Sequence, residues 1–156
     1  MAITRLFRSK KEKIIHEGPK KLVLCVEDIQ TNWEICKAHL EDIYEMHHAT
    51  HSIAAVEKLK AFDFDMILMD IELEGSEMDG ITLTQALRGK LGSLPEHIRE
   101  LGTIDTPIIF LTGYTTLYDR TTAHQAGGTD LFGKPVDFGS LMRTMERVLT
   151  KDNAGD

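Results

Sequence analysis

Residues 66–80 read "MILMDIELEGSEMDG", and this stretch decides how the rest of the chain is interpreted. Four apolar residues run directly into the carboxylate of Asp70, and further acidic residues follow it. A short continuous apolar run is typical of a strand that is covered on both faces, as in a parallel sheet. The acidic residue at its end is then either a turn or cap residue or a reactive group at the edge of the sheet.

The composition indicates one globular domain. The chain has 156 residues, of which 42% are hydrophobic, which suits a domain with a substantial core. No apolar run approaches the roughly 20 residues that span a bilayer, and the N-terminus lacks the apolar centre of a signal peptide. Cys25 and Cys36 show no metal-binding spacing and are interpreted as reduced thiols. We therefore expect a cytoplasmic protein without stable membrane insertion.

Charge is distributed unevenly along the chain. The net charge is −7, yet residues 1–21 hold seven Lys or Arg against two Glu, so the remainder is strongly acidic. An acidic body argues against nucleic-acid binding. We expect residues 1–20 to be a basic extension that frays or docks on the domain, with a membrane-surface or partner helix as the alternative. Residues 151–156 are expected to be a tail.

Apolar runs and helical periodicity alternate along the chain. Strands are predicted at 21–26, 66–69 and 107–111, with weaker candidates at 43–49 and 129–132. Apolar residues recur at helical spacing in the segments after these runs. The alternation predicts an α/β fold, with a doubly wound, five-stranded parallel sheet and five helices.

Residues near 92–105 make one connection long for a fold whose connections are usually short, and we interpret them as an insertion. Its sequence, "GSLPEHIRELG", predicts a short extra helix near 93–101, with Ser93 and Glu96 at the spacing of a capping box. Three apolar residues fall on one face of this helix: Leu94, Ile98 and Leu101. We expect this face to cover the domain's own core, with a partner surface as the alternative.

Polar residues follow four of the predicted strands, and parallel strands place their carboxyl ends at one edge of a sheet. These residues are Glu27 and Asp28, Asp70, Thr112 and Lys134. Three close carboxylates repel one another and need a cation, and hard oxygen ligands with an open side suit Mg²⁺. With Lys134 and Thr112 beside it, Asp70 can accept a phosphoryl group as an aspartyl phosphate.

These residues lie in motifs that resemble the receiver domains of two-component response regulators, a family typified by CheY. The motifs are "VLCVED", "MILMD", "MDGI", "IIFLTGY" and "GKP", within residues 21–150. The resemblance implies a flavodoxin-like strand order, 2-1-3-4-5. It also implies a module that receives a phosphoryl group from a histidine kinase or a phosphotransfer protein. Enzymatic activity is then limited to Mg²⁺-dependent self-phosphorylation from a phosphodonor and to autodephosphorylation.

The resemblance also implies a role for each site residue. Glu27 and Asp28 form the acidic metal pair, Asp70 is the phosphoacceptor, and the backbone carbonyl of Glu72 is a further Mg²⁺ ligand. The phosphoryl group is contacted by Thr112 and Lys134, and Gly113 leaves room for it. A cis peptide bond is expected between Lys134 and Pro135, since proline lowers the cost of a cis bond to about 0.5–1 kcal/mol.

Three positions are expected to tune the phosphorylated state. Glu72 and Tyr114 flank the path of attacking water, and Tyr114 is expected to shield the phosphoryl group. Leu131 stands where the family has a switching aromatic residue, and the aromatic Phe132 lies next to it on the opposite face of the strand. An inward–outward switch at Leu131 should therefore be weak. The signal is then expected to be carried by Thr112, Lys134 and the backbone of residues 113–118.

Two other readings remain open. A phosphatase of the haloacid-dehalogenase type also uses an Asp nucleophile, but it needs a second Asp two residues later, where this chain has Glu72. A receiver-like scaffold that is never phosphorylated is the other reading. Because the chain ends at Asp156, soon after the last predicted helix, we expect a stand-alone regulator that signals through a protein partner. The partner is unknown, and a homodimer is compatible with the sequence.

Overall fold

Five parallel strands form the centre of the protein in a computed structural model that describes residues 3–8, 11–16 and 18–154. They are β3 (Leu22–Val26), β4 (Glu45–Ala49), β5 (Met66–Asp70), β6 (Ile108–Thr112) and β7 (Asp130–Gly133). Their order in the sheet is β4-β3-β5-β6-β7, and every neighbouring pair is parallel. Numbered along the chain within this sheet, the order is 2-1-3-4-5, which confirms the predicted fold.

The burial of the strands follows their position in the sheet. Every residue of the central strands β5 and β6 is buried, which matches their continuous apolar runs. The edge strands β4 and β7 carry polar residues and are partly exposed. The weaker sequence signal of these two strands therefore has a physical cause, because each has only one neighbouring strand.

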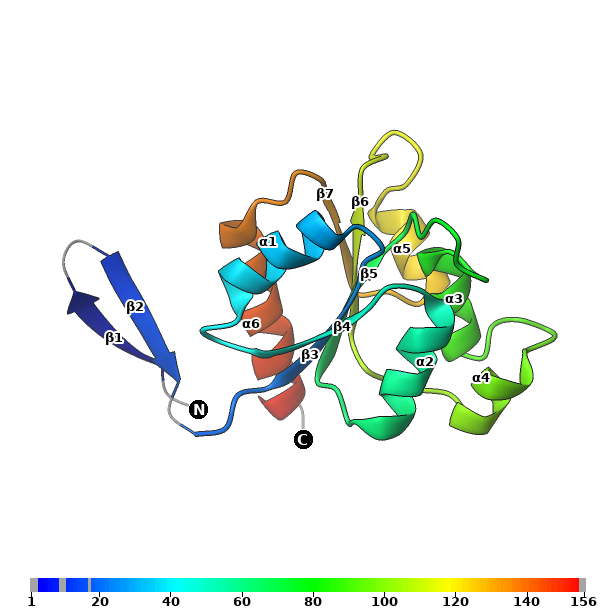
Figure 1. The fold of residues 1–156 in the computed structure, drawn as a ribbon, viewed down its shortest axis with the longest axis horizontal. Helices are drawn as coiled ribbons and strands as arrows, with labels where there is room; N and C mark the ends of the chain where they lie inside the picture. Colours follow the sequence, from blue (N-terminus) through cyan, green and yellow to red (C-terminus); the bar gives the residue numbers. More distant parts are fainter. Residues whose placement is uncertain (1–2, 9–10, 17, 155–156) are drawn as a thin grey trace.

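Helices cover both faces of the sheet (Figure 1). Helices α1 (Gln30–Leu40) and α6 (Phe138–Ala154) lie on one face. The other face is covered by α2 (Ser52–Ala61), α3 (Gly80–Leu87), α4 (Glu96–Leu101) and α5 (Arg120–Ala126). Because successive strand residues point to opposite faces, the sheet supplies a separate apolar core to each layer. The predicted five helices and one extra helix are all present in the described chain.

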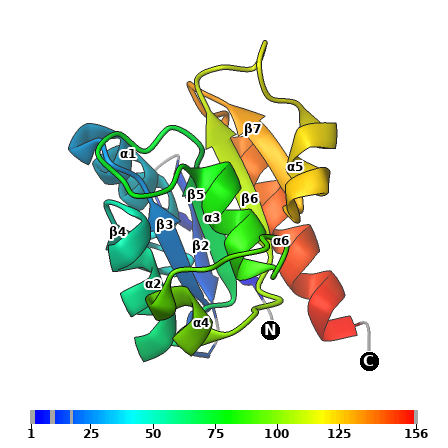
Figure 2. The same ribbon diagram turned by 90° about the vertical axis from the view of Figure 1, so that its right-hand side faces the viewer.

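The extra helix of the insertion is α4, and it packs beside α2 (Figure 2). Ile98 is only 1% exposed, and Lys60 of α2 pairs with Glu100 of α4 at 2.8 Å. The insertion thus covers the domain's own core, as expected. The prediction of a capping box is wrong, because the N-cap residue is Pro95 and no side chain caps the helix.

The three histidines near β4 have separate local contacts. The Nε2 atom of His47 lies 3.1 Å from Glu45 Oε2. The ring of His48 stacks on Trp33, and its Nε2 lies 2.7 Å from the carbonyl oxygen of Glu27. His51 caps α2 by accepting the Ala54 N–H. No metal-binding group of histidines occurs among the described residues.

The described part of the N-terminal segment consists of two paired strands. Strands β1 (Ile3–Arg8) and β2 (Lys11–His16) pair antiparallel in a sheet of their own, drawn apart from the five-stranded sheet in Figure 1. The alternative of a membrane-surface or partner helix is therefore wrong, and the expected fraying is replaced by regular strand pairing. Within the described part of the chain, no helix has the length and apolar character to cross a bilayer.

Substitution of Ile98 tests the docking of α4. Ile98→Ala is expected to lower the free energy of unfolding by about 2–5 kcal/mol, because it removes buried methyl groups and leaves a cavity. Leu117→Ala is the control, since that side chain is 69% exposed and its loss should change stability by less than about 0.5 kcal/mol. Urea denaturation measures both. Equal, small effects would show that α4 does not contribute to the core.

Candidate functional site

The carboxyl ends of four neighbouring strands place the predicted site residues at one edge of the sheet. Glu27 and Asp28 follow β3, Asp70 ends β5, Thr112 ends β6, and Lys134 follows β7. Because β3, β5, β6 and β7 are consecutive in the sheet, residues far apart in sequence become neighbours here. The structure brings all five predicted side chains to this edge.

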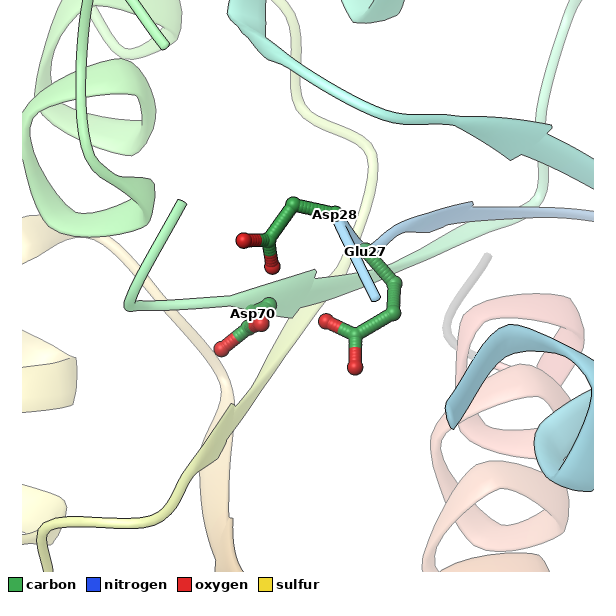
Figure 3. A group of neighbouring side chains, drawn as sticks. All are labelled: Glu27, Asp28 and Asp70. Atoms are coloured by element: carbon green, nitrogen blue, oxygen red, sulfur yellow. The ribbon is translucent and has the colours of Figure 1, made fainter. Parts of the chain in front are cut away.

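Three carboxylates face a common space at this edge (Figure 3). Glu27, Asp28 and Asp70 each offer one oxygen, and these oxygens lie within 4.8 Å of one another. Glu27 is 4% exposed and Asp70 is 2% exposed. Their mutual repulsion is therefore weakly screened by solvent, and it favours a bound cation.

Asp28 provides a test of whether this space suits a metal ion. Its Oδ2 accepts the backbone N–H of Glu74 at 3.1 Å, whereas its buried Oδ1 has no hydrogen-bond partner among the described residues. A buried carboxylate oxygen without a partner is unfavourable. Oxygen ligands from two or three carboxylates are the set that Mg²⁺ takes in proteins, so the residues present fit this ion.

Lys134 connects two of the buried carboxylates. Its Nζ lies 3.0 Å from Asp70 Oδ2 and 3.2 Å from Glu27 Oε1. Burial alone would lower the pKa of Lys134, but the two carboxylates hold it above its ordinary value. The Lys134–Pro135 peptide bond is cis, in agreement with the sequence-based expectation.

The protonation of Asp70 reflects the crowding of negative charge. The pKa of Asp70 is raised to about 9. Burial contributes most, a hydrogen bond with Glu27 and the charge of Glu27 act in the same direction, and Lys134 opposes them. The single positive charge of Lys134 therefore does not balance the negative charges of the two buried carboxylates. A divalent cation in the same space would favour the ionised form of Asp70, which is the form that acts as a nucleophile.

The side chain of Glu72 contacts Thr112 and Gly113, which the sequence did not predict. Its Oε1 accepts the Thr112 hydroxyl at 2.7 Å and the Gly113 backbone N–H at 3.0 Å, and its own N–H donates to Asp70 Oδ1 at 3.1 Å. The sequence indicated a role for the backbone carbonyl and for the path of water, but not this contact. Only the adjacency of β5 and β6 brings residues 72 and 112 together.

Gly80 explains the "MDGI" motif. Its N–H donates to the carbonyl of Ile71 at 2.9 Å, and a Cβ at this position would overlap the backbone carbonyl of Asp70. Asp79 caps the same helix by accepting the Thr82 N–H. The absence of a side chain at Gly80 therefore lets α3 begin against the end of β5.

The two remaining tuning positions, Tyr114 and Leu131, occupy different environments. Tyr114 is 55% exposed, and its backbone N–H donates to Thr112 Oγ at 3.0 Å. Leu131 is buried in the core of the α2–α5 face, whereas Phe132 is partly buried in the core of the α1–α6 face. The two neighbours thus point to opposite sides of the sheet, as the alternation of strand residues requires.

The family model described as "Response regulator receiver domain" matches residues 23–146. The chain therefore belongs to the response regulator receiver domain family, within two-component signalling. Membership leaves the interpretation as a haloacid-dehalogenase-type phosphatase without support, because the family match and the strand order are those of a receiver domain.

Curated relatives include both regulators and sensors. "Transcriptional regulatory protein ZraR" of Klebsiella oxytoca is 28% identical over 135 residues, which is 85% of this chain and 27% of that protein. "Sensor protein GacS" of Pseudomonas syringae pv. syringae is 30% identical over 124 residues, which is 79% of this chain and 13% of that protein. The chain thus spans about a quarter or less of the length of these relatives.

Solved receiver domains share the fold. The receiver domain of sensor histidine kinase PA1611 from Pseudomonas aeruginosa PAO1, solved with a magnesium ion coordinated in its active site cleft, has a TM-score of 0.67. It is 30% identical, and the match covers 84% of this chain and 98% of that one. A putative response regulator from Chloroflexus aurantiacus J-10-fl has the same TM-score at 23% identity.

A side chain at Gly80 is expected to disturb the site. Gly80→Ala should lower the free energy of unfolding by about 1–3 kcal/mol and shift the amide signals of Asp70 and Ile71, because the new methyl group meets the Asp70 carbonyl. Gly92→Ala is the matched control, since nothing lies within 4 Å of a Cβ there. Denaturation and ¹⁵N NMR spectra measure both effects. A Gly80→Ala variant as stable as Gly92→Ala would contradict this account of the motif.

Proposed function

We propose that the chain is a phosphoacceptor module that receives a phosphoryl group on Asp70 from a phosphohistidine of a histidine kinase or phosphotransfer protein. The observation that carries this proposal is the contact of Lys134 with Asp70 inside the cluster of three carboxylates. Lys134 opposes the charge of Asp70 and can follow that charge onto a transferred phosphoryl group. Membership in the receiver family supports the same assignment.

The transfer step forms a bond between a carboxylate oxygen of Asp70 and phosphorus and breaks the bond from phosphorus to the donor nitrogen. Lys134 remains within reach of the negative charge on the phosphoryl oxygens, and the Thr112 hydroxyl and Gly113 N–H are further donors beside the acceptor. Glu27, Asp28, Asp70 and the backbone carbonyl of Glu72 are the groups that would hold Mg²⁺. When bound, this ion supplies positive charge that offsets the carboxylates and the phosphoryl oxygens.

Thr112 is proposed to carry the signal from the phosphorylated site. It lies at the end of the buried strand β6, and its hydroxyl already links Glu72 to the backbone of Tyr114. Leu131 offers no hydroxyl and is buried in a packed core, which supports a minor role in the switch. The exposed ring of Tyr114 is proposed to shield the aspartyl phosphate from water.

The output is proposed to be a protein partner. The chain is acidic outside its N-terminal segment, which disfavours nucleic acid. Tyr114 and Leu117 are large, exposed side chains in the segment that follows Thr112, so a partner can contact residues next to the site. A second copy of the chain would be one such partner.

The phosphoacceptor is tested by intact-mass spectrometry after incubation with Mg²⁺ and acetyl phosphate. The wild type is expected to gain one phosphate, and Asp70→Asn should gain none, because the amide lacks the nucleophilic carboxylate. Asp63→Asn is the control, since Asp63 is exposed and lies before β5, at the opposite end from the site. Modification of Asp70→Asn at the wild-type rate would disprove the assignment, and a wild type that stays unmodified would favour the unphosphorylated scaffold.

The metal site is tested by titration with Mg²⁺. Disturbing the residues that support metal ligands typically weakens binding by about 10- to 100-fold, so loss of a ligand in Asp28→Asn should cost at least about tenfold. Glu74→Gln removes the same charge from an exposed side chain and keeps the backbone N–H that binds Asp28. Isothermal titration calorimetry compares the two affinities. Equal weakening in both variants would indicate a general charge effect instead of coordination by Asp28.

A further inference from the structure

The Glu72 carboxylate occupies the donors that the proposed function reserves for a phosphoryl group. Its Oε1 receives both the Thr112 hydroxyl and the Gly113 N–H, at 2.7 and 3.0 Å. These two donors lie at the end of β6. This strand pairs with β5, the strand that ends at Asp70. The Glu72 carboxylate thus takes the hydrogen bonds that a phosphoryl group on Asp70 would need.

The space beside Gly113 supports the same interpretation. The nearest heavy atom to a Cβ built on Gly113 is Glu72 Oε1, at 3.8 Å. The Glu72 carboxylate therefore borders the room that the glycine leaves. A phosphoryl group that is to contact the Gly113 N–H has to move this carboxylate away.

The contact is also costly for Glu72. Its second oxygen, Oε2, is buried and has no hydrogen-bond partner among the described residues. The carboxylate lies next to Asp70, whose Oδ1 already takes the Glu72 N–H, so negative charges gather here. A side chain that gains two hydrogen bonds but leaves a buried oxygen unpaired is released more readily than a fully satisfied one.

We propose that Glu72 is an internal surrogate for the phosphoryl group, which holds Thr112 and Gly113 until phosphorylation displaces it. This inference rests on the proposed function, because it assigns a regulatory role to a residue of the same site. Two anions compete for one pair of donors, and a dianionic phosphoryl group also repels the carboxylate. Phosphorylation therefore exchanges one ligand of Thr112 for another and frees the side chain of Glu72.

The exchange has a consequence for the rate of phosphorylation. Glu72 must leave before Thr112 and Gly113 can stabilise the incoming group, so the contact slows phosphorylation. Loss of a hydrogen bond to a charged group changes an equilibrium by about tenfold or more. Glu72→Ala is therefore expected to speed phosphorylation by acetyl phosphate by about tenfold, and Glu72→Gln, which keeps an acceptor but not the charge, by less.

The first measurement is made on the full chain without any phosphodonor. Amide hydrogen exchange and the ¹⁵N NMR signal of Gly113 report directly on the bond to Glu72. In Glu72→Ala we expect faster exchange of this exposed amide by about tenfold and a shifted signal, and in Glu72→Gln a smaller change. Glu74→Ala is the matched control, because it removes an exposed carboxylate from the same loop and leaves the Gly113 contact intact.

The second measurement is the initial rate of phosphorylation of the same variants by acetyl phosphate and Mg²⁺. Faster modification of Glu72→Ala, with Glu74→Ala at the wild-type rate, supports the proposal. A Gly113 amide that is unchanged in Glu72→Ala overturns it, and so does a rate equal to or below that of the wild type. If no variant and not even the wild type is modified, the proposed function fails, and Gly113 exchange alone decides whether Glu72 holds the donors.

Discussion

The ion pair between Lys134 and the buried carboxylates of Asp70 and Glu27 is the interaction on which the site depends. The three side chains come from β5 and from the ends of β3 and β7, so the pair exists only when the sheet has its full order. A buried charge that loses its partner is strongly unfavourable. The same contact therefore links the correct assembly of three strands to the electrostatics of Asp70.

The surrounding elements position the backbone of Asp70 and Glu27 at this edge of the sheet. Gly80 lets α3 begin against the Asp70 carbonyl, and His48 binds the carbonyl of Glu27 while it stacks on Trp33. These contacts position the chain on both sides of the acidic cluster. The insertion that carries α4 lies beside α2 and supports the core beneath this layer, away from the reactive edge (Figure 2).

Glu72 gives the site a feature that the ion pair alone does not explain. Lys134 is directed at Asp70, whereas the donors at the end of β6 are directed at Glu72. The site thus keeps its cationic and its neutral donors on different carboxylates. A group that joins Asp70 would bring both sets of donors onto one anion, which is the physical basis for a change in state.

The sequence by itself determined the sheet, its strand positions and the identity of the five polar residues at its edge, because buried strands and helices leave strong apolar patterns. It also indicated the docking of α4, through the spacing of Leu94, Ile98 and Leu101. It did not reveal the antiparallel pairing of residues 3–8 with 11–16, the N-cap at Pro95 or the contact of Glu72 with Thr112. These depend on local hydrogen bonds and on which strands become neighbours, and only the tertiary structure brings residues 72 and 112 within 2.7 Å.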